Sequence, residues 1–167
     1  ENKPGNTILN YGIKITATAN ISAYYEAGRT NNPEIFPLKG QIGMGLSFIV
    51  PMQTRFDNHV PHTPPAHNGF AIVATEDNTL VTITPTNTDS AGHPPNIPFA
   101  ITLQKGQSYA VIAANNQAAL HLGGSTVKAN KPICVTVYDD SVVLGTSYDL
   151  VGDQIVPEIN TGSEFIM

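Results

Sequence analysis

The chain has 167 residues, of which 41% are hydrophobic and 13% are charged, and its formal net charge is −5. This length fits one domain with a substantial core, and the composition excludes a disordered chain and a membrane-spanning helix. The eight Lys and Arg residues are scattered, so we expect no nucleic-acid partner. Charged residues reach only about half of their usual share. Polar uncharged residues must therefore cover the surface, as they do in many exported all-β proteins.

Short runs rich in Val, Ile, Thr, Tyr and Phe recur along the chain, separated by Gly, Pro, Asn and Asp. Such runs predict strands, and no dozen residues keep a helical apolar period. We therefore predict an all-β fold, an antiparallel β-sandwich with jelly-roll or Ig-like layering and long Pro-rich loops. The predicted strands are residues 12–18, 21–25, 43–50, 69–76, 79–85, 98–104, 107–113, 124–129, 133–138 and 163–167.

The stretch "FAIVATEDNTLVTITPT" predicts a hairpin. Asp77 and Asn78 tolerate the positive φ angles of a two-residue turn. This turn would pair Ile72 with Ile83 and place an apolar face on the core, and a shift by one residue would mix the two faces.

The stretch "PFAITLQKGQSYAVIA" predicts a second hairpin. Gln104 and Lys105 would form a type I turn, with Gly106 in the left-handed position of a bulge. This register pairs Ile101 with Tyr109 on the apolar face.

Two long Pro-rich connectors, residues 53–68 and 86–97, exceed the usual loop length. Both are either binding loops or simple insertions. Three imidazoles and a carboxylate in the first connector could ligate zinc or another divalent metal, but three prolines interrupt the loop, and solvated histidines are the alternative. The candidate ligand-binding residues of this loop are Asp57, His59, His62 and His67.

Four carboxylates toward the C-terminus form a second candidate set. Oxygen ligands at one end of a sandwich could hold Ca²⁺, the one cofactor that we consider, although Asp is also a common turn residue. Their spacing lacks the regularity of a dedicated calcium loop. The candidate metal ligands are Asp139, Asp140, Asp149 and Asp153.

Two further residue types bear on function. The single cysteine, Cys134, alternates with expected core positions, which predicts a buried and inert thiol. Tyr24 and Tyr25 are adjacent and must point to opposite faces of a strand. Because the sequence contains no Trp, we include Tyr25 among the candidate ligand-contacting residues.

The sequence has no hydrolase elbow, zinc-protease motif or phosphate loop, so we expect no enzyme.

The succession of these motifs resembles the IgGFc-binding protein N-terminal domain family. The resemblance runs from about Gly12 to the C-terminus through "ITATANISAYY", "GLSFIVP", "FAIVATEDNTLVTITP", "ITLQKGQSYAVIA", "STVKANKPICVTVYDDS" and "YDLVGDQIVP". It implies an extracellular, non-catalytic, β-rich module of adhesion type within a longer protein. It carries over no ligand-binding motif, and the Pro- and His-rich segment 53–68 departs from the family pattern.

We expect one β-rich domain over residues 1–167. A weak echo between "GLSFIVP" and "GSEFIM" suggests one repeat over about 12–150 and the start of a second over about 151–167. The expected function is a secreted or cell-surface module that recognises a protein or glycan through its loops. The alternatives are a spacer repeat without a ligand and a metal-dependent hydrolase that uses His59, His62 and His67. An exposed strand edge would also favour self-association.

Overall fold

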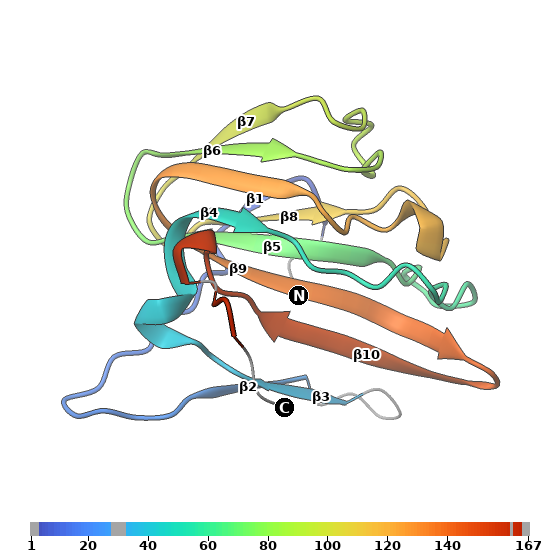
Figure 1. The fold of residues 1–167 in the computed structure, drawn as a ribbon, viewed down its shortest axis with the longest axis horizontal. Coiled ribbons are helices and arrows are strands. Elements are labelled where there is room, and N and C mark those ends of the chain that lie inside the picture. The colour runs from blue at the N-terminus through green and yellow to red at the C-terminus, as the bar shows by residue number, and fades with distance from the viewer. Residues whose placement is uncertain (1–3, 28–32, 161, 165–167) are drawn as a thin grey trace.

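The structure is a computed structural model that describes residues 4–27, 33–160 and 162–164. It confirms the predicted all-β class, with antiparallel strands and three short 3₁₀ turns in the described residues (Figure 1). The elements are β1 (Ile8–Leu9), β2 (Tyr24–Ala27), β3 (Glu34–Pro37), η1 (Gly40–Gly43), β4 (Met44–Ile49), β5 (Asn68–Ala74), β6 (Thr79–Thr84), β7 (Phe99–Leu103), β8 (Ser108–Ile112), η2 (Ala118–Leu120), β9 (Thr126–Leu144), β10 (Ser147–Gln154) and η3 (Glu158–Asn160).

Strand β9 organises the fold because it pairs with both layers of the sandwich. Its first part pairs with β6 and β4, and its last part pairs with β5 and β10. One layer is therefore β1-β8-β5-β9-β10 and the other is β7-β6-β9-β4, joined into one barrel-like sheet. Residues 127, 133, 135 and 137 of β9 are all buried, so one face of the strand contributes to the core in both layers.

The core lies between the two layers. Full burial of each large apolar side chain stabilises the fold by about 1.5–3 kcal/mol. The largest apolar side chains with no exposed surface are Phe48, Phe70, Ile72, Ile83, Leu103, Leu122 and Ile133.

The predicted hairpin around Asp77 and Asn78 is wrong in its pairing. Strand β5 pairs with β8 and β9, and β6 pairs with β7 and β9, so β9 lies between the two strands that the turn connects. Asn78 adopts the predicted positive φ, at 55°, but Asp77, which was expected to share this conformation, does not. The turn therefore carries the chain from one layer to the other, and Ile72 and Ile83 belong to the same core but are not ladder partners.

The second predicted hairpin fails in the same way. Gly106 has the expected left-handed φ of 78°, but β8 pairs with β1 and β5 while β7 pairs with β6. The two layer-crossing turns are neighbours, because the Lys105 N–H donates to Asp77 Oδ1 at 2.9 Å. Crossing at two adjacent turns lets both strand pairs bury their apolar faces in one core.

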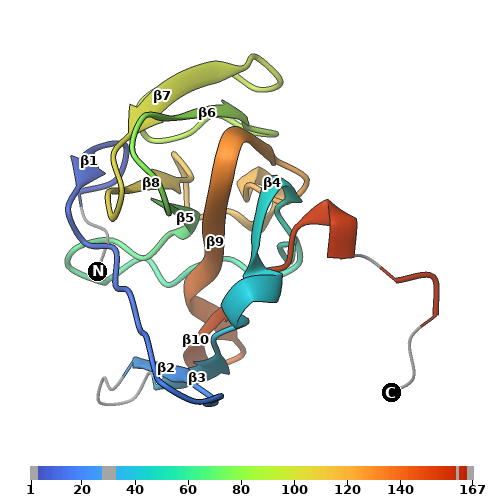
Figure 2. The same ribbon diagram turned by 90° about the vertical axis from the view of Figure 1, so that its left-hand side faces the viewer.

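The N-terminal prediction also needs correction. Residues 12–18 form no strand, and Ile13 and Ile15 are 78% and 52% exposed. This segment runs along one side of the molecule from β1 to β2 (Figure 2). No neighbouring strand pairs with it, so its apolar and β-branched residues do not form a strand. Strand β3, which pairs with β2, was not predicted.

The C-terminal strands differ from the prediction as well. The predicted strands 124–129 and 133–138 are parts of the single strand β9. Strand β10 was missed because Asp149, Gly152 and Asp153 belong to residue types that are rare in strands. Of the predicted strand 163–167, residues 163 and 164 are not in a strand, and the rest lies outside the described residues. The proposed repeat boundary near residue 150 stays a prediction.

Candidate functional site

The long connectors gather at one end of the sandwich, on the right in Figure 1. We call this surface the loop end and define it as residues 50–67, 85–98, 113–125 and 145–146. Both connectors predicted from the sequence belong to it. The layer-crossing turns lie at the opposite end of the sandwich (Figure 1).

Hydrogen bonds join the three long loops of this end. The Ala118 N–H donates to Asp57 Oδ1 at 2.7 Å, so this candidate ligand-binding carboxylate holds the start of η2. Asn87 Nδ2 donates to the His121 carbonyl at 2.8 Å, which connects the loop 85–98 to the same turn. The loop 113–125 therefore lies between the other two loops and is bonded to both.

A buried polar network lies beneath these loops. His121 is 1% exposed, and its Nε2 lies 2.9 Å from Asn58 Oδ1 while its Nδ1 lies 3.0 Å from the Gln53 carbonyl. Asn58 Nδ2 donates to Asp139 Oδ1 at 2.7 Å, and Gln53 Nε2 donates to Asp139 Oδ2 at 2.7 Å. The carboxylate of Asp139 is thus saturated by the side chains of the loop 50–67.

Oxygen atoms lie at both ring nitrogens of His121. Asn58 Nδ2 also donates to the Asp140 carbonyl at 2.6 Å, so its amide orientation is fixed and its Oδ1 must accept from His121. Gln53 Nε2 uses its hydrogens on Asp139 and on the Phe56 carbonyl, which leaves the Gln53 carbonyl as the acceptor for Nδ1. Both ring nitrogens therefore lie within hydrogen-bond distance of oxygen atoms, and Asp139 Oδ2 lies 3.5 Å from Nδ1.

The four candidate metal-binding aspartates have separate roles in the structure. Asp139 belongs to the buried network, and Asp140 Oδ1 accepts from the Ser141 hydroxyl at 2.9 Å. Asp149 Oδ1 accepts from the next backbone N–H, and Asp153 pairs with Lys39 at 2.9 Å. Within the part of the chain that the structure describes, no three His, Cys, Asp or Glu side chains are arranged to hold a metal ion.

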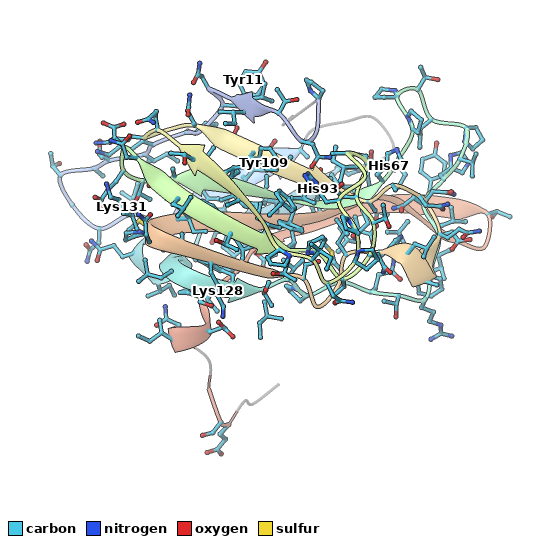
Figure 3. All side chains as sticks on the ribbon, turned by 90° about the horizontal axis from the view of Figure 1, so that it is seen from above. Tyr11, His67, His93, Tyr109, Lys128 and Lys131 are labelled. Carbon is cyan, nitrogen blue, oxygen red and sulfur yellow. The ribbon has the colours of Figure 1, made fainter. Side chains whose placement is uncertain are left out.

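The loop histidines divide into two groups. The rings of His59 and His62 contact each other, with centroids 4.9 Å apart, and both pack on Tyr148 at the start of β10. His67 lies immediately before β5, where its carbonyl accepts from the Asp140 N–H at 3.2 Å (Figure 3). Tyr25 lies away from all three, on β2, with its ring 5.3 Å from that of Phe36.

Sequence reasoning missed a second histidine centre in the loop 85–98. His93 Nδ1 lies 2.7 Å from Oδ2 of the buried Asp89, and the His93 ring stacks on Phe99 with 3.7 Å between centroids (Figure 3). Burial, and then the charge of Asp89, raise the pKa of Tyr109 to about 12. The available signal was an Asp four residues before a His inside a long loop, which is the spacing of a local carboxylate–imidazole contact.

A shallow cleft opens beside the loop end, between the start of the loop 50–67 and the strands β9 and β10. Its volume is about 160 Å³. This is below the roughly 300–1,000 Å³ of typical small-molecule sites. The lining residues are Pro51, Met52, Gln53, Val137, Tyr138, Asp139, Val151, Gly152 and Asp153.

The fold and the loop end describe an all-β domain that presents its irregular backbone at one end. Residues 38–167 match the family model described as IgGFc binding protein, which covers most of the chain, so the chain belongs to this family. The resemblance inferred from the motifs is therefore confirmed. Searches of curated proteins and of solved structures found no match. In the described residues, no helix has the length and apolarity needed to cross a membrane.

Proposed function

We propose that this domain is a non-catalytic binding module of a secreted or cell-surface protein, and that its loop end contacts a protein partner. The family supports a binding role, because its description names a binding activity and no reaction. An antibody Fc region is therefore a rational first probe, although no binding motif for it can be assigned to particular residues of this chain.

The observation that carries the proposal is the buried network under the loops. Gln53 and Asn58 hold the loop 50–67 against His121 and Asp139, and Asn87 holds the loop 85–98 against the same turn. Loops ordered before binding lose less conformational entropy when a partner docks.

The outer side chains of the loop end favour a protein over a small molecule. Val60 is 68% exposed, Ile97 is 55% exposed, and the adjacent hairpin ends on Leu144, which is 65% exposed. Apolar side chains within a polar rim are typical of protein interfaces. The nearby cleft is too small to enclose a drug-sized ligand.

The test compares binding to an array of extracellular proteins, Fc included, and glycans. Val60→Arg places a charge on the loop end, and Leu80→Arg places the same charge on β6, where Leu80 is 46% exposed. We expect a protein on the array to bind the wild type, with at least a tenfold loss of affinity for Val60→Arg and no loss for Leu80→Arg. If the domain binds nothing on the array, the spacer alternative is favoured. If it binds only glycans, and this binding depends on the loops, the partner is a glycan and not a protein.

A further inference from the structure

We propose that His59 and His62 together bind a divalent transition-metal ion at the point where the loop 50–67 packs on β10. This site is distinct from the buried network of His121 and from the four aspartates considered above. The proposal concerns metal binding by the loop and does not depend on the identity of a protein partner.

The first argument is the geometry of the two rings. Their centroids are 4.9 Å apart and their planes are inclined by 66°. Two imidazoles that ligate one tetrahedral ion at 2.0–2.1 Å have ring centres about 5 Å apart. The ring centres therefore already have the separation that a shared ion requires.

The second argument is that the rings have nitrogen atoms without partners. His59 Nδ1 and His62 Nε2 are both buried, and neither has a hydrogen-bond partner among the described residues. A buried polar atom without a partner costs about 1–3 kcal/mol. Two such atoms in touching rings are explained at once if both lone pairs bind the same ion.

The third argument is the role of Tyr148. Its ring stacks on His59 with centroids 4.5 Å apart and meets His62 edge-on at 5.0 Å. Tyr148 thus packs against both rings from the β10 side. An ion held by the two imidazoles would tie the loop 50–67 to the β9–β10 hairpin.

The donor set limits the ion and its affinity. Imidazole suits Zn²⁺, Ni²⁺ and Cu²⁺, with Cu²⁺ bound most tightly. No third His, Cys, Asp or Glu of the described residues joins the pair. Water must complete the coordination, so we expect a modest, exchangeable affinity with one ion per chain and no site for Ca²⁺, which prefers oxygen ligands.

The test is isothermal titration of the untagged, EDTA-treated protein with Ni²⁺, Zn²⁺ and Ca²⁺. We expect one Ni²⁺ or Zn²⁺ per chain with a micromolar Kd, no heat with Ca²⁺, and at least a tenfold weaker Kd in His59→Gln and in His62→Gln. The control His93→Gln should bind as the wild type does, because the His93 ring stacks on Phe99 and its Nδ1 contacts Asp89.

Two results would overturn the proposal. One is a wild-type Kd weaker than 1 mM for both transition metals, and the other is an affinity that survives in both His59→Gln and His62→Gln. Circular dichroism establishes whether each variant is folded. Tyr148→Phe keeps both imidazoles and the ring packing, so its Kd for the metal ion should match that of the wild type. This variant is a second check, because it changes the site without removing a ligand.

Discussion

Nδ1 of His121 lies 3.5 Å from Oδ2 of Asp139, and the two side chains are 0% and 4% exposed. His121 follows the short turn η2, whereas Asp139 lies on β9, so the contact joins a loop to the central strand. Asn58 bridges the two side chains from a third segment. The stability of the loop end therefore depends on one buried cluster of charged and amide groups.

Removing either His121 or the Asp139 carboxylate should be destabilising. His121→Ala leaves the buried Asn58 Oδ1 without its ring partner, and Asp139→Asn replaces a carboxylate oxygen that accepts from Asn58 or Gln53 by an NH₂ group. A buried polar group left without its partner costs about 1–3 kcal/mol, and more where the group is charged. Urea denaturation should show this loss in the free energy of unfolding for each variant. The matched control, Asp149→Asn, alters an exposed carboxylate on β10 and should change that free energy by less than about 0.5 kcal/mol. If Asp139→Asn and Asp149→Asn lower the free energy of unfolding equally, the buried network does not stabilise the loop end.

Gly106 should resist substitution because of its backbone conformation alone. Its φ is 78°, and a Cβ built at this position meets no atom within 4 Å, so the effect isolates backbone strain from crowding. Gly106→Ala should lower the free energy of unfolding by about 1–2 kcal/mol, measured by thermal or urea denaturation. Gly106→Asn should be milder, because Asn tolerates the left-handed region better than Ala does. An Ala variant as stable as the wild type would mean that the turn adopts another conformation.

Tyr109 should make the protein less stable at alkaline pH. Its folded pKa is raised to about 12 from 10, mainly by burial and then by Asp89. Between these values the unfolded chain loses the phenolic proton while the folded chain keeps it. The contribution is therefore complete below pH 10 and falls by about 1.4 kcal/mol per pH unit up to about pH 12.

Denaturation from pH 9 to 12 measures this effect. In Tyr109→Phe the extra loss above pH 10 should be absent. Asp89→Asn should lower the pKa of Tyr109, as measured by ultraviolet titration, but not to 10, because burial is the larger cause. If the free energy of unfolding falls more steeply above pH 10 in Tyr109→Phe than in the wild type, ionisation of Tyr109 is not the cause of the alkaline loss of stability.

Cys134 should react slowly with thiol reagents in the folded protein. The thiol is half-buried rather than fully buried as the sequence predicted, and burial raises its pKa. The reactive thiolate is therefore scarce at pH 7–8. Reaction with an aromatic disulfide reagent should be at least tenfold slower in buffer than in 6 M guanidinium chloride. Comparable rates in the two solvents would show that the thiol is accessible and ionised.

The sequence by itself determined local properties of the chain. Alternation along β5 and β6 identified Ile72 and Ile83 as core residues, and both are fully buried. Turn chemistry identified Asn78 and Gly106 as positive-φ positions, and both are. These features depend on side-chain period and backbone sterics within a few residues, so a short stretch contains the information.

Only the tertiary structure decided which strands pair and which polar groups meet. Any antiparallel neighbour can satisfy the hydrogen bonds of β5. The 19-residue strand β9 takes that place rather than β6, because it is long enough to pair with both layers. The same holds for the loops. His59 contacts Tyr148, and Asp139 contacts His121, across long separations in the chain. Such contacts follow from the packing of the whole domain, and no local pattern specifies them.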